Sequence, residues 1–87
     1  MSKKAIDESL RKVLSGRGNL SFRELEALLR RLGFSLDRTH GSHRIYSHPK
    51  LVRPFPIQPA GSDAKHYQLR ELRDIIVHNR LQIGKDE

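Results

Sequence analysis

The sequence predicts an α+β domain in which helices flank a small antiparallel sheet. Three features indicate this class: a well-capped helical pattern comes first, short strand patterns follow across residues 34–58, and a further amphipathic helix pattern spans residues 66–79. The chain has 87 residues, enough for one domain with one small core. We expect an N-terminal extension at residues 1–20, a main domain at 21–81 and a C-terminal tail at 82–87.

The N-terminal extension has the periodicity of an amphipathic helix. Its apolar residues recur at helical spacing over residues 3–14: Ile6, Leu10, Val13 and Leu14. Two glycines within residues 15–19 then interrupt the pattern, as in a flexible joint. The first 20 residues carry five basic and two acidic side chains, a balance that also suits a solvated, partly disordered arm. A docked helix and an arm both remain open at this point.

The next helix carries signals at both ends. Ser21 and Glu24 have the spacing of a capping box, in which each side chain accepts a hydrogen bond from the other residue's backbone N–H. Gly33 suits the left-handed conformation that often follows the last turn. Between them runs one apolar stripe at helical spacing, formed by Phe22, Leu25, Leu28, Leu29 and Leu32.

The first two strands are predicted to form a hairpin. By the period of two, Phe34, Leu36 and Arg38 share one face of the first strand. Residues 39–42 form the turn, where Gly41 supplies the positive φ that a tight hairpin usually needs. The second strand follows and ends at a proline.

The rest of the chain completes one small sheet and one helix. A third strand at residues 53–58 contains two prolines, which cannot donate ladder hydrogen bonds, so it belongs at a sheet edge. Residues 59–63 have the composition of a loop. The helix at residues 66–79 turns four apolar side chains inward, namely Leu69, Leu72, Ile75 and Ile76, and Leu81 follows as a final apolar plug.

This order has a simple packing solution. Both main helices cover one face of the three-stranded antiparallel meander, and the other face stays open. The resulting α-β-β-β-α arrangement is that of the double-stranded-RNA-binding domain. Here it carries an extra helix or arm at its N-terminus.

The charge and composition restrict the classes of partner. A formal net charge of +7 favours nucleic acid, an anionic membrane or an acidic protein. The chain has no cysteine, so it forms no disulfide and no thiolate metal site. No apolar run approaches the roughly 20 residues of a membrane span. The first residues also lack the apolar stretch of a signal peptide. We therefore expect a cytoplasmic protein with no membrane contact.

The tripeptide Gly41-Ser42-His43 is the strongest chemical signal. Histidine is the side chain whose ordinary pKa lies closest to neutrality, so it can accept and donate protons at physiological pH. On a strongly basic protein, such a group suggests chemistry on a polyanion, and RNA is the obvious candidate. Strand parity places His43 on the same face as Ile45. If Ile45 faces the helices, His43 faces them too, and the sequence leaves this open.

Other side chains give weaker signals. His40, His43 and His48 raise the question of a metal, but two of them fall on opposite strand faces and no cysteine is present, so we expect no metal. Tyr46 and Phe55 could stack on bases, although packing is the more ordinary role for the few aromatic residues of a small core.

The residues quoted above also form part of a longer pattern. It comprises Leu32-Gly33-Phe34, Arg38, Gly41-Ser42-His43, Ile45-Tyr46 and His48-Pro49, and continues through Ile57-Gln58-Pro59, Gly61, Ala64-Lys65, Tyr67-Gln68, Arg70 and Ile75-Ile76. Over residues 20–81 this pattern resembles the HicA-type, YcfA-like mRNA interferases of bacterial toxin–antitoxin systems. The chain departs from many members at Pro56-Ile57-Gln58-Pro59, where they carry a Pro-x-His segment.

The resemblance implies a double-stranded-RNA-binding-like fold, an endoribonuclease toxin that cleaves mRNA, and a HicB-type antitoxin that covers the active site. It also implies that His43 is the catalytic residue. A base at this position could remove the proton of the RNA 2′-hydroxyl, which then attacks the adjacent phosphorus without a metal or cofactor. The candidate RNA-binding residues around it are Arg38, Ser42, Arg44, Lys65 and Arg70.

Two other functions fit the same composition. A non-catalytic RNA-binding module of this fold would keep the basic charge without depending on His43. An interaction protein would use its basic surface mainly to dock an acidic partner.

Overall fold

The computed structural model describes residues 2–84 and confirms the α+β class. The three helices of these described residues are α1 (Lys3–Ser15), α2 (Phe22–Arg31) and α3 (His66–Asn79). The five strands between residues 2 and 84 are β1 (Ser35–His40), β2 (His43–Ser47), β3 (Phe55–Ile57), β4 (Pro59–Ala60) and β5 (Asp63–Ala64). Strands β1, β2 and β3 form an antiparallel sheet in that order, so the part from α2 to α3 is compatible with the expected α-β-β-β-α order.

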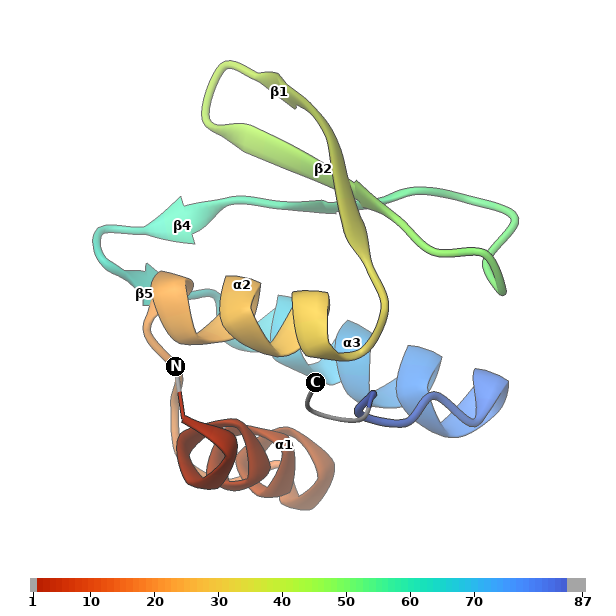
Figure 1. Cartoon of the computed structure of the whole chain (residues 1–87). Helices are drawn as coiled ribbons and strands as arrows, with labels where there is room; N and C mark the ends of the chain where they lie inside the picture. The colour runs from red at the N-terminus through yellow and green to blue at the C-terminus, as the bar shows by residue number, and fades with distance from the viewer. Residues whose placement is uncertain (1, 85–87) are drawn as a thin grey trace.

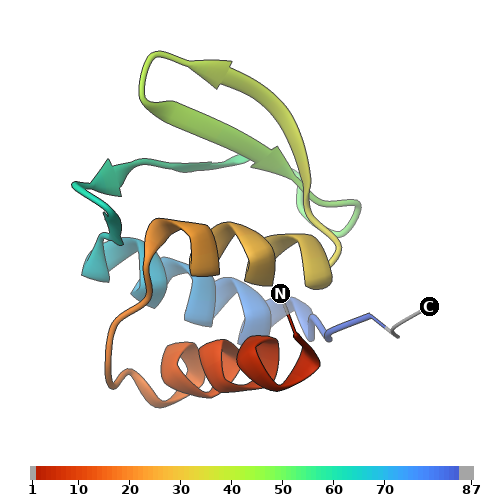
Figure 2. The ribbon, with the colours of Figure 1, turned by 60° about the vertical axis from the view of Figure 1, so that its left-hand side comes forward.

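The elements are stacked in three layers (Figure 1). The β1–β2–β3 sheet forms the first layer, α2 and α3 form the second, and α1 packs on the far side of the helix pair. Both main helices therefore cover the same face of the sheet, and within residues 2–84 no element covers its other face (Figure 2).

The N-terminal extension is a docked helix and not an arm. The Ser2 side chain accepts a hydrogen bond from the Ala5 backbone N–H at one end, and Gly16 adopts a left-handed conformation with φ of 73° at the other. Ile6 and Val13 are only 1% and 2% exposed. Full burial of such side chains is worth roughly 1.5–3 kcal/mol each, which is enough to hold a short helix against its neighbours.

The expected capping box is present at the start of α2. The Ser21 N–H donates to Glu24 Oε1 over 2.8 Å, and the Glu24 N–H donates to Ser21 Oγ over 3.1 Å. The helix ends at Arg31, and Gly33 follows the Leu32 C-cap with a φ of 100°. A Cβ at Gly33 would lie 3.0 Å from His48 Nε2, so both the backbone conformation and the close contact favour glycine here.

His48 ties the end of β2 to the end of α2. Its Nδ1 accepts a hydrogen bond from the Lys50 N–H over 3.0 Å, so Nε2 carries the proton and donates to the Leu32 carbonyl over 2.9 Å. The ring also packs edge-on against Phe34, with 4.9 Å between ring centroids. Both ring nitrogens are therefore used in holding the fold.

A β-bulge changes the predicted face of the first strand. Leu36 pairs with Tyr46, but the next pair is Arg38 with Ile45, so Asp37 is an extra residue. The expectation that Phe34, Leu36 and Arg38 share one face is therefore wrong at Arg38. One inserted residue reverses the alternation, and the period of two cannot reveal where the insertion falls.

The turn and the loop also differ from expectation. Strand β1 extends to His40, so the turn contains only Gly41 and Ser42; Gly41 alone has positive φ, 63°, as a type II′ turn requires. Residues 59–63, expected to be a loop, contribute to the β4–β5 hairpin instead. Each of these strands has two residues, too few to produce a recognisable pattern.

The core lies between the sheet and the helices, with a second contact zone under α1. The sheet contributes Tyr46, Phe55 and Ile57, all at most 3% exposed, which agrees with packing roles for the two aromatic residues. Leu81 is buried as expected. In the expected tail, the Gly84 N–H donates to the Arg31 carbonyl over 2.8 Å, while residues 85–87 lie outside the described residues. Over residues 2–84, no helix is long and apolar enough to cross a membrane.

Candidate functional site

The burial of Tyr46 shows which face of β2 is turned to the helices, and this fixes the side on which His43 projects. Tyr46 is fully buried against the helices, whereas Ile45 is only half-buried and pairs with Pro56 on β3. Side chains alternate along a strand, so Ile45 and His43 lie on the face of the sheet that the helices leave open. The large aromatic ring takes the core position, and His43 is exposed at the start of β2.

His40 lies directly opposite His43 on the neighbouring strand. The two residues form the pair next to the Gly41-Ser42 turn, and both are exposed. Opposite residues in an antiparallel pair project from the same face, with Cβ atoms about 4.5–5.5 Å apart. From the sequence, His40 is considered only as a possible metal ligand. The bulge and the two-residue turn that create the pair cannot be recognised in the sequence.

A chain of hydrogen bonds brings Ser42 and Lys65 together beside His43. Gln58 Nε2 donates to Ser42 Oγ over 2.9 Å, and Lys65 Nζ donates to Gln58 Oε1 over 3.2 Å. The β2–β3 register pairs Arg44 with Ile57, so its next step places Gln58 next to His43. Gln58 is the connecting residue that sequence reasoning missed. The only signal was its position in the segment that departs from Pro-x-His.

Helix α3 holds this chain in place. Gln68, which is 4% exposed, accepts the backbone N–H of Gln58 at Oε1 over 3.2 Å and directs its Nε2 to the Pro56 carbonyl at 3.4 Å. Lys65 is the residue before α3, and its ammonium lies 5.9 Å from the centroid of the Tyr67 ring. The predicted site residues Ser42 and Lys65 are thus positioned by the start of α3.

Arg44 lies on the opposite face from His43. Its Nε forms an ion pair with Glu26 Oε2 over 2.5 Å, and the Tyr46 hydroxyl donates to the same carboxylate oxygen. Burial and this hydrogen bond raise the pKa of Tyr46, so the phenol stays neutral. Arg44 therefore joins the sheet to α2, and the structure does not bring it to His43.

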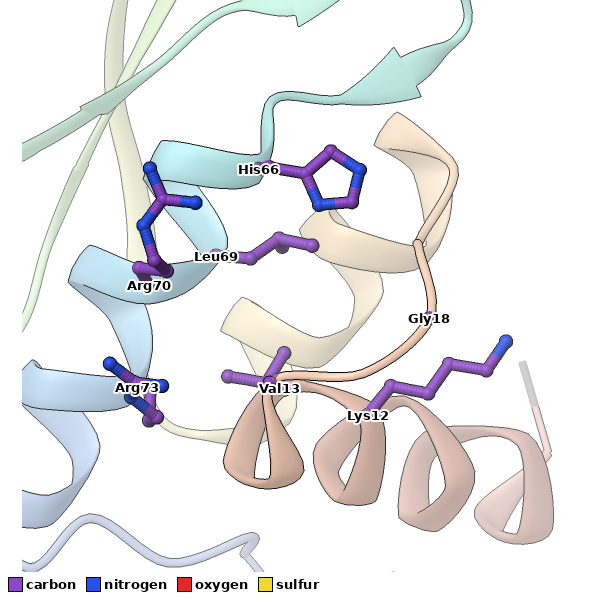
Figure 3. A pocket seen from close by; sticks show the side chains of 8 residues that line it. Lys12, Val13, Gly18, His66, Leu69, Arg70 and Arg73 are labelled. Carbon is purple, nitrogen blue, oxygen red and sulfur yellow. The ribbon is translucent and has the colours of Figure 1, made fainter.

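The two remaining candidates lie in different places. Arg38 pairs with Ile45, so it lies on the open face together with His43, and it is exposed. Arg70 lies on α3 and lines a cleft against the end of α1 (Figure 3). The structure therefore groups Arg38, Ser42 and Lys65 around His43 and places Arg70 in a separate cleft.

The described residues contain no group of three or more histidine, cysteine, aspartate or glutamate side chains placed to hold a metal ion. His40 and His43 are close together, but His48 is engaged by Leu32 and Lys50 at the other end of β2.

A comparison with known protein families identifies the family of this chain. The family model described as HicA toxin of bacterial toxin-antitoxin matches residues 22–76, from the first residue of α2 into the last turns of α3. The chain belongs to the HicA toxin family. HicA toxins are RNase-like, which supports nuclease activity in the broad sense, and a toxin of this kind implies an antitoxin partner. Helix α1 precedes the matched segment. No curated protein and no solved structure matched the chain.

Proposed function

We propose that this HicA-family chain is an endoribonuclease that cleaves mRNA and uses His43 as its catalytic residue. The observation that carries the proposal is the position of His43 on the open sheet face, with Arg38 on the same face and the Lys65–Gln58–Ser42 hydrogen-bond chain beside it. The placement of α2 and α3 on one side of a three-stranded sheet supports a double-stranded-RNA-binding-like fold for residues 21–81.

The first step of the reaction is proton transfer from the RNA. A neutral His43 accepts the proton of a 2′-hydroxyl, and the 2′-oxygen attacks the adjacent phosphorus while the bond from phosphorus to the 5′-oxygen breaks. General base help of this kind contributes about 10²–10⁴-fold to the rate. The cations Arg38 and Lys65 stabilise the charge that develops on the phosphoryl oxygens. The attacking group belongs to the substrate, so this route needs no metal-bound water.

The leaving 5′-oxygen needs a proton, and His40 is placed to supply it. It stands opposite His43 across the hairpin and projects from the same face, so a phosphate group can lie between a base on one side and an acid on the other. Two charged groups lie near this pair. Arg38 projects from the same face of β1, and Lys65 donates a hydrogen bond to Gln58, which lies next to His43. The products are a 2′,3′-cyclic phosphate and a 5′-hydroxyl.

A HicB-type antitoxin is the proposed inhibitor. The open sheet face is basic at its edge and carries the half-buried Ile45 and the exposed Pro56 at its centre, so it offers apolar area inside a cationic rim. An acidic antitoxin would be steered to this face by the net charge of +7 and would cover His43. Occlusion of His43 and exclusion of RNA are then one event.

The test compares His43→Ala with His78→Ala, a matched control that removes another exposed histidine near the far end of α3. Purified proteins are incubated with RNA in EDTA, and their folding is checked by circular dichroism. We expect the wild type and the His78 variant to cleave RNA and a folded His43 variant to bind without cleaving. Cleavage by the folded His43 variant would remove the catalytic assignment. If the wild type binds RNA without cleaving it, the protein is a non-catalytic RNA-binding module.

A further inference from the structure

A cationic cleft separates the end of α1 from the first half of α3 (Figure 3). Its volume is about 80 Å³. Val13 and Leu69 provide apolar lining. Four basic side chains line it as well, and none of its lining residues is acidic: Lys12 comes from α1, and His66, Arg70 and Arg73 come from α3. A site of this size and charge suits a single phosphate group.

Glycines in the joint after α1 allow the basic side chains to approach closely. A Cβ on Gly16 would lie 3.3 Å from Arg73 Nη1, so the guanidinium rests against the bare end of the helix. A Cβ on Gly18 would lie 3.4 Å from Cδ of Lys12. The joint therefore shapes one wall of the cleft in addition to connecting two helices.

The positive charges in the cleft are only weakly compensated. Arg73 Nε lies 3.5 Å from Asp74 Oδ1, but this pair is solvent-exposed and contributes little. Lys12 Nζ reaches the Asn19 carbonyl at a long 3.4 Å. Within residues 2–84, the side chains of Arg70 and His66 have no hydrogen-bond or ion-pair partner. Figure 3 shows the Lys12 ammonium directed away from Arg70 and Arg73, so the cations are spread along the cleft. Because no acidic side chain lines the cleft, a bound anion would stabilise them.

The cleft and the proposed active site are linked by the chain at the start of α3. Lys65, which hydrogen-bonds Gln58 beside His43, immediately precedes His66 in the cleft wall. The start of α3 therefore joins the two sites, and Figure 2 shows the hairpin turn, the first turn of α3 and the joint after α1 along the same flank of the molecule. An RNA strand that follows this flank meets cationic groups along its length.

We propose that this cleft binds a backbone phosphate of the same RNA strand that is cut at His43, and that α1 thereby extends the RNA-binding surface of the toxin domain. The inference rests on the proposed function. It assigns a substrate-binding role to a helix that lies outside the family match at residues 22–76. RNA is favoured over an acidic protein because the cleft accommodates one anionic group and lies along the same flank as the site of the cleavable phosphate.

The experiment measures single-stranded RNA binding by fluorescence anisotropy over a range of salt concentrations, with full-length protein in the His43→Ala background. The cleft variant is Lys12→Gln with Arg70→Gln. Its matched control is Arg11→Gln with Arg53→Gln, which removes the same charge from exposed positions that do not line the cleft. The cleft holds one phosphate, and each lost phosphate contact lowers the salt slope of single-strand binding by about 0.7, so we expect a fall of about 0.7 for the cleft variant and none for the control.

A second comparison uses RNA length. A dinucleotide can occupy the His43 face alone, so the cleft variant should bind it as the parent protein does, while a longer strand should be bound more weakly. Equal slopes in the cleft and control variants would overturn the inference while leaving the proposed function intact, since the parent would still bind RNA. Loss of antitoxin binding with unchanged RNA binding would assign the cleft to a protein partner. Absence of RNA binding in every protein would instead contradict the proposed function.

Discussion

Replacing Tyr46 with phenylalanine should destabilise the protein without changing its chemistry. The Tyr46 side chain is fully buried, and its hydroxyl donates to the Glu26 carboxylate that also binds Arg44. A hydrogen bond to a charged group is worth about 1.5–3 kcal/mol, and the retained Arg44 pair keeps the carboxylate partnered, so we expect a loss near 1.5 kcal/mol. For a domain of this size, that loss lowers Tm by about 6–12 °C.

The same substitution has a defined effect on the pH dependence of stability. Burial and the bond to Glu26 raise the pKa of Tyr46 in the folded state. The neutral phenol is therefore favoured by folding, and its contribution is fully present below the ordinary tyrosine pKa of about 10. The contribution is lost as the pH rises through the higher folded-state value. The wild type should lose this stability in strong alkali, and Tyr46→Phe should not show that component of the loss.

Thermal and urea unfolding between neutral and alkaline pH measure both effects. Cleavage per folded molecule should be unchanged, because Tyr46 projects to the helices while His43 projects to the open face. An unchanged Tm at neutral pH, or an alkaline loss of stability as large in the variant as in the wild type, would refute the role assigned to the hydroxyl. Loss of cleavage in a folded variant would refute the separation of the two faces.

Three further predictions concern the hairpin and its supports. Gly33→Ala should destabilise the fold by at least about 1–2 kcal/mol in chemical unfolding, because residue 33 has positive φ. Combining it with His48→Ala should remove the part of this loss that comes from the 3.0 Å contact with the His48 ring. If the losses of stability in the two single variants simply add up in the double variant, the contact contributes nothing. His40→Asn should slow cleavage and remove the alkaline limb of a bell-shaped pH–rate profile, whereas an unaltered profile would exclude an acid role. Arg38→Gln should weaken RNA binding more than Arg44→Gln, because Glu26 already pairs with Arg44; equal losses would argue against the open face as the RNA surface.

The helices could be predicted closely because their signals are local. The capping box at Ser21 and Glu24, the apolar periodicity and the glycine after α2 all act within a few residues, and each appears in the structure. Whether α1 docks depended instead on apolar area supplied by α2 and by α3, which lies far along the chain. Periodicity shows that a helix has an apolar face but not what covers that face.

The site was less predictable because its geometry depends on pairing between strands. The bulge at Asp37 moves Arg38 to the face of His43, and the two-residue turn creates the pair of His40 with His43. Sequence distance also misled for Arg44, which adjoins His43 in the chain but projects from the other face. The resemblance pointed to His43, whereas the link from Ser42 to Lys65 through Gln58 required the packed structure.

The chemical ends of the cleaved RNA test the central claim most directly. If a histidine on this face removes the 2′-hydroxyl proton, the upstream fragment ends in a 2′,3′-cyclic phosphate or its hydrolysed form, and the downstream fragment begins with a 5′-hydroxyl. Mass spectrometry of fragments made by the wild type in EDTA should show these ends, and folded His43→Ala should yield none. Fragments that carry only 3′-hydroxyl ends, or cleavage that stops when metal is removed, would contradict the account.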